Sequence, residues 1–79
     1  MLKAKTIQQS IYYTLRRHVE YRRSTYMNWL LTLSDEDSDR ILTIDPNTDP
    51  KEWIKGVSKK DPAFMGRLIN AIEYPSLYA

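Results

Sequence analysis

Hydrophobic residues recur at helical spacing along the first third of the chain. Between residues 6 and 33 they are three or four positions apart, which is the pattern of an apolar stripe on an amphipathic helix. The stripe consists of Ile7, Ile11, Leu15, Val19, Tyr26, Leu30 and Leu33, with Ala4, Tyr12, His18 and Trp29 on it or beside it. Thr6 is a suitable N-cap, and residues 2–45 contain neither Gly nor Pro. The pattern predicts one long helix over about residues 6–33.

The stripe is least regular at Arg22, which falls among the apolar positions and is followed by Ser24 and Thr25. Two interpretations fit. Either the helix ends near Arg23 and a second helix begins at Ser24 or Thr25, or one helix continues with a kink at residues 22–24. In the second case Arg22 pairs with an acidic residue from the middle of the chain. We favour the single, kinked helix.

Residues 34–42 carry a helix-start signal of their own. Ser34 can cap a helix, and the carboxylates of residues 35–37 follow it, where the N-terminal end of a helix favours negative charge. These residues predict a short helix over about 35–42. The β-branched residues among 41–44 leave an extended conformation as the alternative there.

Two Asp-Pro steps predict two further helices. Asp49-Pro50 and Asp61-Pro62 each place a capping carboxylate before a proline at the first helical position. The predicted helices cover about residues 50–58 and 62–74. The second has an apolar stripe made of Met65, Leu68, Ile69 and Ile72, and Pro75 ends it.

These elements predict an all-α fold, a small single-domain helical bundle over residues 1–79. In it, three short helices pack across the apolar face of the long N-terminal helix. A chain of this length buries only about 60–65% of its unfolded surface, so its stability requires tight helix packing or self-association as a homodimer. The tail, residues 75–79, is apolar and aromatic, and we expect Leu77 and Tyr78 to pack on the core or on a partner.

Charge is unevenly distributed although the net charge is only +2. Residues 1–23 contain six Lys and Arg against one Glu, whereas residues 24–52 contain two against seven Asp and Glu. The basic end could bind a polyanion. The acidic middle could equally fold back onto it, and we favour this second interpretation because the opposing charges match in size.

The sequence contains no recognisable equipment for catalysis. Cysteine is absent, and His18 is the single histidine, with no acidic residue three or four positions away to orient it. A nucleophile needs a base and an orienting group within hydrogen-bond reach, so we expect His18 to pack at the boundary of the core. We therefore predict no enzyme activity and no cofactor.

The acidic residues 35–39 raise the question of a metal site. Asp35, Asp37 and Asp39 match the first three ligand positions of a calcium-binding loop. Arg40, however, stands where the loop needs glycine, and Pro46 stands where it needs a bidentate Glu. The acidic residues are better explained as a helix start, and we predict no bound metal.

Tyrosine and arginine alternate through residues 12–23, a pattern that suits phosphate contact combined with base stacking. On a continuous helix, however, Arg17 projects about 100° away from the face that Arg16 and Arg23 share. Glu20 can pair with both of these arginines and neutralise part of that face.

The last two predicted helices could form a helix-turn-helix. Arg67 is then the one side chain near the start of the second helix that could read a base edge. A single such side chain is too few for specific recognition in the major groove. Both observations make nucleic acid the second choice of partner.

Six tyrosines and two tryptophans exceed what so small a core can bury, and these residues, with arginine, are enriched in protein interfaces. We predict a non-enzymatic protein-protein interaction module or regulator that binds and modulates a larger protein. The alternative is a nucleic-acid-binding protein that uses the basic, tyrosine-rich N-terminal helix. The predicted partner-binding residues are Tyr13, Arg16, Arg17, Tyr21, Arg23, Tyr74 and Tyr78.

In size and make-up the chain resembles the small accessory regulators of phages, plasmids and bacterial operons. No apolar run approaches the ~20 residues that cross a membrane, and the first residues lack the apolar core of a signal peptide. We expect a cytoplasmic protein without membrane attachment.

Overall fold

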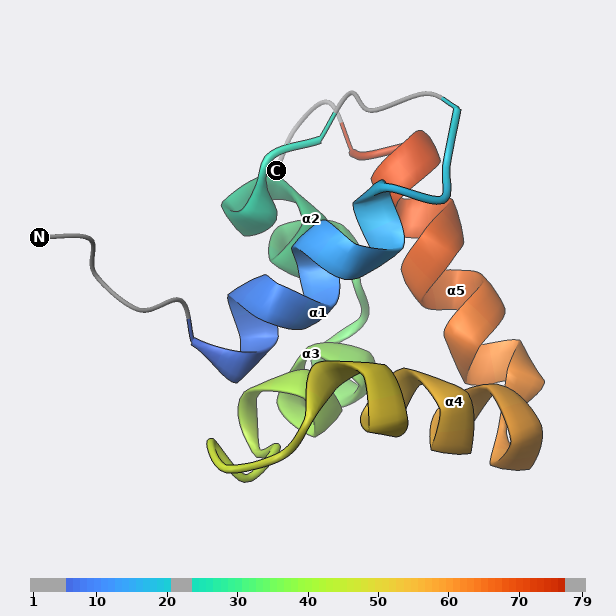
Figure 1. The fold of residues 1–79 in the computed structure, drawn as a ribbon. Coiled ribbons are helices and arrows are strands. Elements are labelled where there is room, and N and C mark those ends of the chain that lie inside the picture. Colours follow the sequence, from blue (N-terminus) through green and yellow to red (C-terminus); the bar gives the residue numbers. More distant parts are fainter. Residues whose placement is uncertain (1–5, 21–23, 77–79) are drawn as a thin grey trace, which may run out of the picture.

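The computed structural model describes residues 6–20 and 24–76, which form five α-helices joined by short connections (Figure 1). The helices are α1 (Ile7–Arg16), α2 (Tyr26–Thr32), α3 (Asp35–Leu42), α4 (Pro50–Lys60) and α5 (Pro62–Glu73). The prediction of an all-helical chain is confirmed for these residues, which contain no strand. None of the helices in these two ranges has the length and apolar character needed to cross a membrane.

The N-terminal helix is much shorter than predicted. α1 ends at Arg16 and α2 begins at Tyr26, so the prediction of one helix over residues 6–33 is wrong. The alternative with two helices describes the chain better, because Thr25 caps α2, although the first helix ends well before Arg23. Arg22, which the single-helix interpretation pairs with an acidic residue, lies outside the described residues.

The chain turns back because two aromatic side chains share one buried cluster. In a continuous helix Tyr12 and Trp29 would lie about 26 Å apart along the axis. Their ring centroids are 5.2 Å apart, and both side chains are fully buried. Tyr26 packs against both rings. The Tyr12 hydroxyl donates a 2.6 Å hydrogen bond to the carbonyl of Ser24, which fixes the chain just before α2.

Short polar side chains start the remaining helices, at the positions that the sequence indicates. Ser34 Oγ accepts a hydrogen bond from the N–H of Asp37 at the start of α3. Asp49 and Asp61 cap α4 and α5, each before a proline. Asp61 is also the only residue between these two helices, because α4 continues to Lys60, beyond its predicted end.

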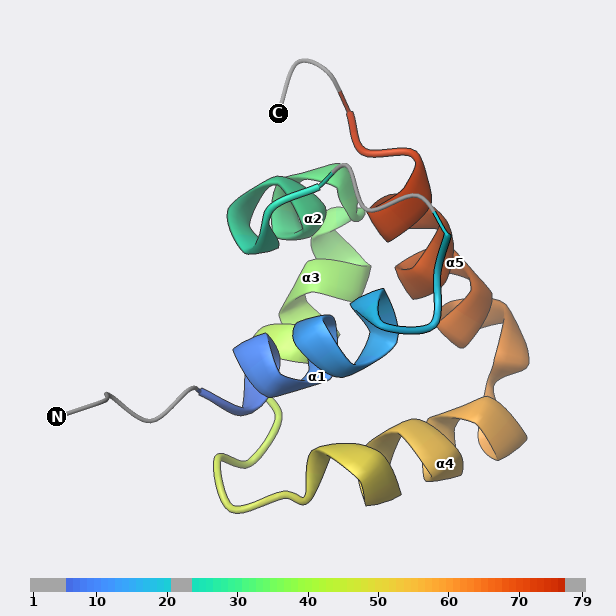
Figure 2. The same cartoon turned by 45° about the horizontal axis from the view of Figure 1, so that its top comes forward.

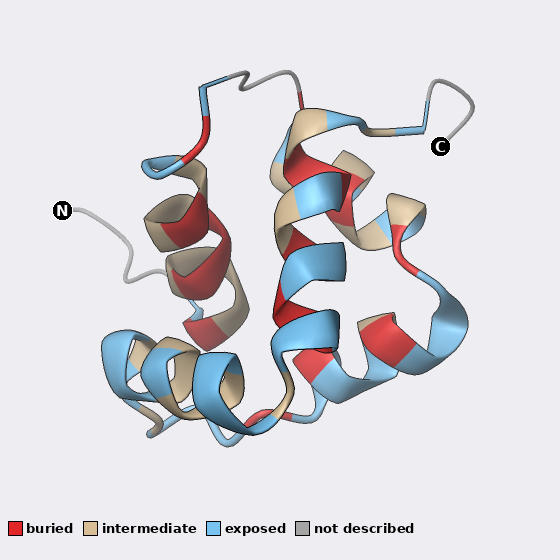
Figure 3. Cartoon of the chain, turned by 90° about the vertical axis from the view of Figure 1, so that its right-hand side faces the viewer, coloured by how far each residue is buried: buried red, intermediate tan, exposed pale blue. Residues whose placement is uncertain are grey.

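The helices enclose one core between them. α1 packs against α4 and α5, and α5 also packs against α2 and α4 (Figures 1 and 2). Buried stretches of α1, α3 and α5 are turned toward the interior, whereas α4 covers one edge with no fully buried residue (Figure 3). The buried hydrophobic residues are Ile7, Ile11, Tyr12, Leu15, Val19, Trp29, Leu33, Ile41, Ile44, Phe64, Met65, Leu68, Ala71 and Ile72.

Two hydrogen bonds connect the aromatic cluster to the backbone of other segments. Besides the bond from Tyr12 to Ser24, the indole Nε1 of Trp29 donates to the carbonyl of Leu68 in α5 at 2.9 Å. Buried polar atoms that lose such a partner are costly, since no water replaces it. The two bonds therefore fix where α2 sits relative to α1 and α5.

Replacing Tyr12 by Phe tests this arrangement. We expect Tyr12→Phe to lower the free energy of unfolding by about 1–2 kcal/mol, because the buried Ser24 carbonyl loses its donor. Urea unfolding followed by tryptophan fluorescence measures the change. Tyr74→Phe removes the same hydroxyl from an exposed ring and should change stability by less than about 0.5 kcal/mol. If both substitutions lowered the free energy of unfolding equally, the stabilising role of the hydrogen bond from Tyr12 to Ser24 would be contradicted.

Candidate functional site

The structure describes four of the seven predicted partner-binding residues. Tyr13 is half-buried, with its ring edge-to-face on Tyr12 at 5.0 Å. Arg16 is half-buried in the last turn of α1, and its Nε is buried without a hydrogen-bond partner among the described residues. Arg17 is exposed at the C-terminal cap of α1, and Tyr74 is exposed at the end of α5. Tyr21, Arg23 and Tyr78, together with Leu77, lie outside the described residues.

The end of α1 changes the expected surroundings of the basic residues. The predicted ion pair between Glu20 and Arg16 is absent from residues 6–20 and 24–76, because Glu20 lies beyond the helix. His18 is exposed in the turn after α1 and does not pack at the core boundary as predicted. Among the described residues, the acidic middle segment forms an ion pair with α5, between Asp37 and Arg67. Because α1 ends at Arg16, with Arg17 as its C-cap, residues 17–20 do not continue the helix that would place Arg16 and Arg23 on one face.

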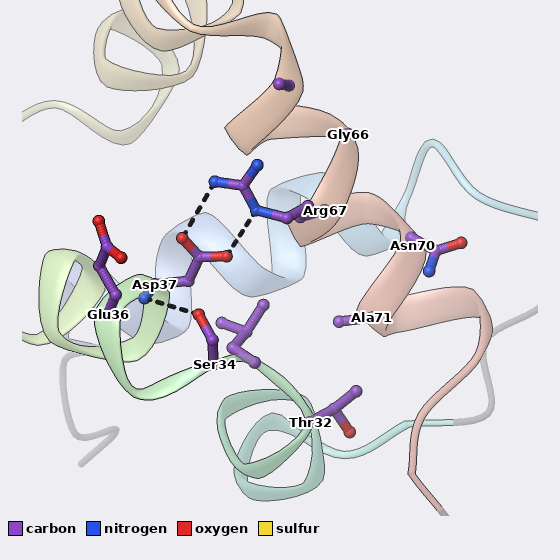
Figure 4. Close-up of a pocket in the computed structure, with 10 residues that line it drawn as sticks. Thr32, Ser34, Glu36, Asp37, Gly66, Arg67, Asn70 and Ala71 are labelled. Atoms are coloured by element: carbon purple, nitrogen blue, oxygen red, sulfur yellow. Dashed lines mark hydrogen bonds and ion pairs between the residues drawn. The ribbon is translucent and has the colours of Figure 1, made fainter.

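A groove that is open to solvent runs between the α2–α3 junction and α5 (Figure 4). It has a volume of about 800 Å³. One wall is made of Thr32, Leu33, Ser34, Glu36 and Asp37, and the other of Ala63, Gly66, Arg67, Asn70 and Ala71. The α5 residues recur every three or four positions and so form one face of that helix. A Cβ at Gly66 would meet no atom within 4 Å, so this wall has room for a larger side chain.

An ion pair between Asp37 and Arg67 bridges the two walls (Figure 4). Arg67 Nε donates to Asp37 Oδ2 at 2.7 Å and Nη2 donates to Oδ1 at 3.1 Å, which is the bidentate geometry that Arg and carboxylate favour. The Asp37 side chain is only 6% exposed, whereas that of Arg67 is 53% exposed. The guanidinium holds the pKa of Asp37 below its usual value of 3.8 in spite of burial.

A second charged contact between α3 and α5 lies one turn further along α3. Arg40 Nη1 donates to Asp61 Oδ2 at 3.2 Å, and its guanidinium carbon lies 3.7 Å from the centroid of the buried Phe64 ring. The hydrogen bond from the Phe64 N–H, followed by that from Arg40, lowers the pKa of Asp61. The Asp37–Arg67 and Arg40–Asp61 pairs thus link α3 to α5 and to its N-cap.

The α2 helix, which ends at the groove with Thr32, also has an exposed apolar side. Met27 and Leu31 are one helical turn apart and are 60% and 61% exposed, on the side of α2 opposite Trp29. We call this pair the α2 ridge. Between the ridge and the groove, Thr32 Oγ1 accepts a 2.8 Å hydrogen bond from the N–H of Ser76, and Asn28 Nδ2 donates to the Ser76 carbonyl at 3.3 Å. Thr32 lines the groove and directly follows Leu31 in the chain, so the ridge, Ser76 and the groove are neighbours at the end of α2.

The described residues contain no group of three or more His, Cys, Asp or Glu side chains arranged to hold a metal ion. Asp37, one of the three carboxylates that match a calcium loop, is engaged by Arg67. The other two, Asp35 and Asp39, are exposed on α3. The residues that line the groove offer hydrogen bonds, charge and apolar contacts.

Comparison of the chain with protein-family models, curated proteins and solved structures finds no match. The groove and the α2 ridge were not identified from the sequence. Asp37 and Arg67 are thirty positions apart, and no local pattern relates them. Met27 and Leu31, by contrast, fall off the apolar stripe of residues 6–33, and that departure was the available signal.

The pH dependence of stability tests the pair between Asp37 and Arg67. We expect Asp37→Asn to lower the free energy of unfolding at pH 7 by about 1–2 kcal/mol, a value reduced for the exposure of Arg67. The pKa of Asp37 is lower in the folded state than in the unfolded state. The stabilisation by the Asp37 carboxylate is therefore fully present above pH 3.8 and is lost as the pH falls through the folded-state pKa. Urea unfolding should therefore show the wild type and the variant converging in stability as the pH falls from 3.8 through the folded-state pKa of Asp37.

Asp39→Asn provides the control, because Asp39 is an exposed carboxylate on the same helix. We expect it to change stability by less than about 0.5 kcal/mol at either pH. A difference between wild type and Asp37→Asn that stays constant from neutral to acid pH would contradict the role of the ion pair.

Proposed function

We propose that this protein is a non-enzymatic helical module that binds and modulates a larger protein through the α2 ridge and the adjoining groove. The observation that carries the proposal is the exposure of Met27 and Leu31, one turn apart, beside a groove of about 800 Å³. Single exposed apolar residues are common on protein surfaces. A pair on one helix face that adjoins a groove is more typical of a binding surface.

The composition of this surface suits a protein partner. Burial of a large apolar side chain contributes about 1.5–3 kcal/mol, so covering the ridge would supply a large part of a binding free energy. Around it, Glu36, Asn70 and the half-exposed Arg67 offer hydrogen bonds and charges at the groove walls. An apolar centre with a polar rim is the usual arrangement of protein interfaces. Tyr74, which is 66% exposed and two residues before Ser76, is a further exposed aromatic side chain at the end of α5.

The N-terminal helix gives less support to nucleic-acid binding than the sequence pattern indicates. A phosphate contact needs an accessible guanidinium, and the Nε of Arg16 is buried. Tyr13 packs on Tyr12, so only part of its ring can stack with a base. We therefore keep the protein partner as the first choice, with the ridge as its centre.

Paired substitutions in affinity capture test the proposal. We expect the full-length tagged protein to retain a partner that is lost when Met27→Ser and Leu31→Ser are combined. Leu42→Ser is the matched control, because Leu42 is 57% exposed on α3 and outside the ridge. Mass spectrometry identifies the captured proteins. A binding titration with the purified partner then gives the ratio of the dissociation constants of variant and wild type. We expect the double variant to bind the partner at least about 10-fold more weakly. Burial of the two side chains together would contribute about 1.4 kcal/mol or more to the binding free energy.

The groove is tested by filling it. Gly66→Gln adds a side chain at the groove wall, and Gly56→Gln adds the same side chain to α4, where a Cβ is equally free of contacts. Both changes replace glycine in a helix and should leave stability unchanged or raise it by about 0.5 kcal/mol. We expect only Gly66→Gln to weaken the partner. Two outcomes would overturn the proposal. One is that neither the ridge variant nor Gly66→Gln weakens capture of the partner. The other is that Leu42→Ser weakens capture as much as the ridge variant does.

A further inference from the structure

The outward face of α4 carries a row of lysines. Lys51, Lys55 and Lys59 are spaced four residues apart and are all exposed. On the opposite side of the helix, partly buried hydrophobic residues pack on the core, namely Trp53, Ile54 and Val57. The spacing and the burial together place the three lysines on one exposed face, which we call the lysine row. Including Lys60, α4 contains four lysines against the single acidic residue Glu52.

The fold itself makes no use of the lysine row. Within residues 6–20 and 24–76, the side chains of Lys51, Lys55 and Lys59 take part in neither an ion pair nor a hydrogen bond. Like charges four residues apart on a helix repel each other. Lys51 also lies in the first turn of α4, where the helix dipole disfavours a positive charge. The arrangement therefore opposes folding slightly, and a bound polyanion would relieve that repulsion.

We propose that the lysine row binds the phosphate backbone of a nucleic acid without regard to its sequence. Lysines four residues apart on a helix lie about 6 Å from one another along the axis, so they form a regular line of charge. Successive phosphates of a nucleic-acid strand form a regular line of the opposite charge. The row contains no Arg, Asn or Gln side chain that could read a base edge, so its contacts are to phosphate alone.

The surroundings of the lysine row favour nucleic acid over an anionic membrane. A helix that lies on a membrane combines its basic face with apolar side chains that enter the lipid. The apolar residues of α4 instead pack on the core of the protein. The exposed apolar pair, Met27 and Leu31, is on α2, and no residue of α4 lines the groove. The lysine row is thus a second surface, beyond the proposed protein-binding one, and differs from the arginine-bearing helix at the N-terminus.

Salt dependence of duplex binding tests this site. The probe is a fluorescently labelled 20-base-pair DNA duplex of arbitrary sequence, titrated with the full-length protein and followed by anisotropy. Three phosphate contacts predict a slope of log K against log salt of about −2.7, which is a loss of about 40-fold between 50 and 200 mM salt. We expect the combined Lys51→Gln, Lys55→Gln and Lys59→Gln variant to bind at least about 10-fold more weakly at 50 mM, with a slope near zero.

Three controls separate charge at this face from other effects. Lysine-to-arginine changes at the same three positions keep the charge and should retain the wild-type affinity and slope. Lys55→Gln should lower the slope by about one, whereas Arg17→Gln, which removes one charge from the end of α1, should leave it unchanged. Because the three lysines are exposed, the glutamine variant should keep the wild-type circular dichroism and an equal or higher urea midpoint.

Three results would overturn the proposal. The protein could fail to bind the duplex at 50 mM salt, or the triple glutamine variant could bind it as tightly as the wild type. Arg17→Gln could also lower the salt slope as much as Lys55→Gln does. Vesicles that contain phosphatidylserine form the last comparison. If the protein bound them through the same lysines and did not bind the duplex, the row would be a membrane site, and the assignment to nucleic acid would be wrong.

Discussion

The shared burial of Tyr12 and Trp29 determines how the first half of the chain is arranged. Each ring lies in the same cluster, and each carries a polar atom that needs a partner away from water. Tyr12 finds its partner at Ser24, and Trp29 finds its partner on the backbone of α5 at Leu68. With both bonds made, α2 can lie in only one place between α1 and α5. The rest of the structure is built around that placement, including the surface that α2 leaves exposed.

The candidate protein-binding surface follows from this placement of α2. Because Trp29 faces the core, Met27 and Leu31 face solvent on the opposite side of the same short helix. α3 then begins directly after α2, and Asp37 in its first turn meets Arg67 across the groove. Apart from Leu33 and Ser34, the residues that line the groove belong to helices. A partner would meet a surface whose shape is set before binding, which reduces the entropy lost on association.

Local signals in the sequence gave the helix starts, whereas the chain reversal required tertiary information. Ser34, Asp49 and Asp61 cap helices because their side chains bond to N–H groups a few residues away, and such contacts are visible in sequence. The stripe over residues 6–33 correctly marked most core positions. It could not show that two helices share the core, because nothing in residues 17–25 breaks a helix unless the aromatic cluster forms. The pair between Asp37 and Arg67 was hidden for the same reason, whereas the departure of Met27 and Leu31 from the stripe was a local signal for the ridge.

Asp61 joins α4 to α5 as a single residue with four simultaneous bonds. Its N–H donates to Val57, its carbonyl accepts from Met65, and its carboxylate binds both the Phe64 N–H and Arg40. The angle between the two helices is therefore set at one well-fixed corner. α4 carries the lysine row and α5 forms a wall of the groove. The lysine row and the groove therefore lie on two helices whose mutual angle is fixed. Molecules held on both would be presented to each other in a constant relative orientation, without any need for a hinge.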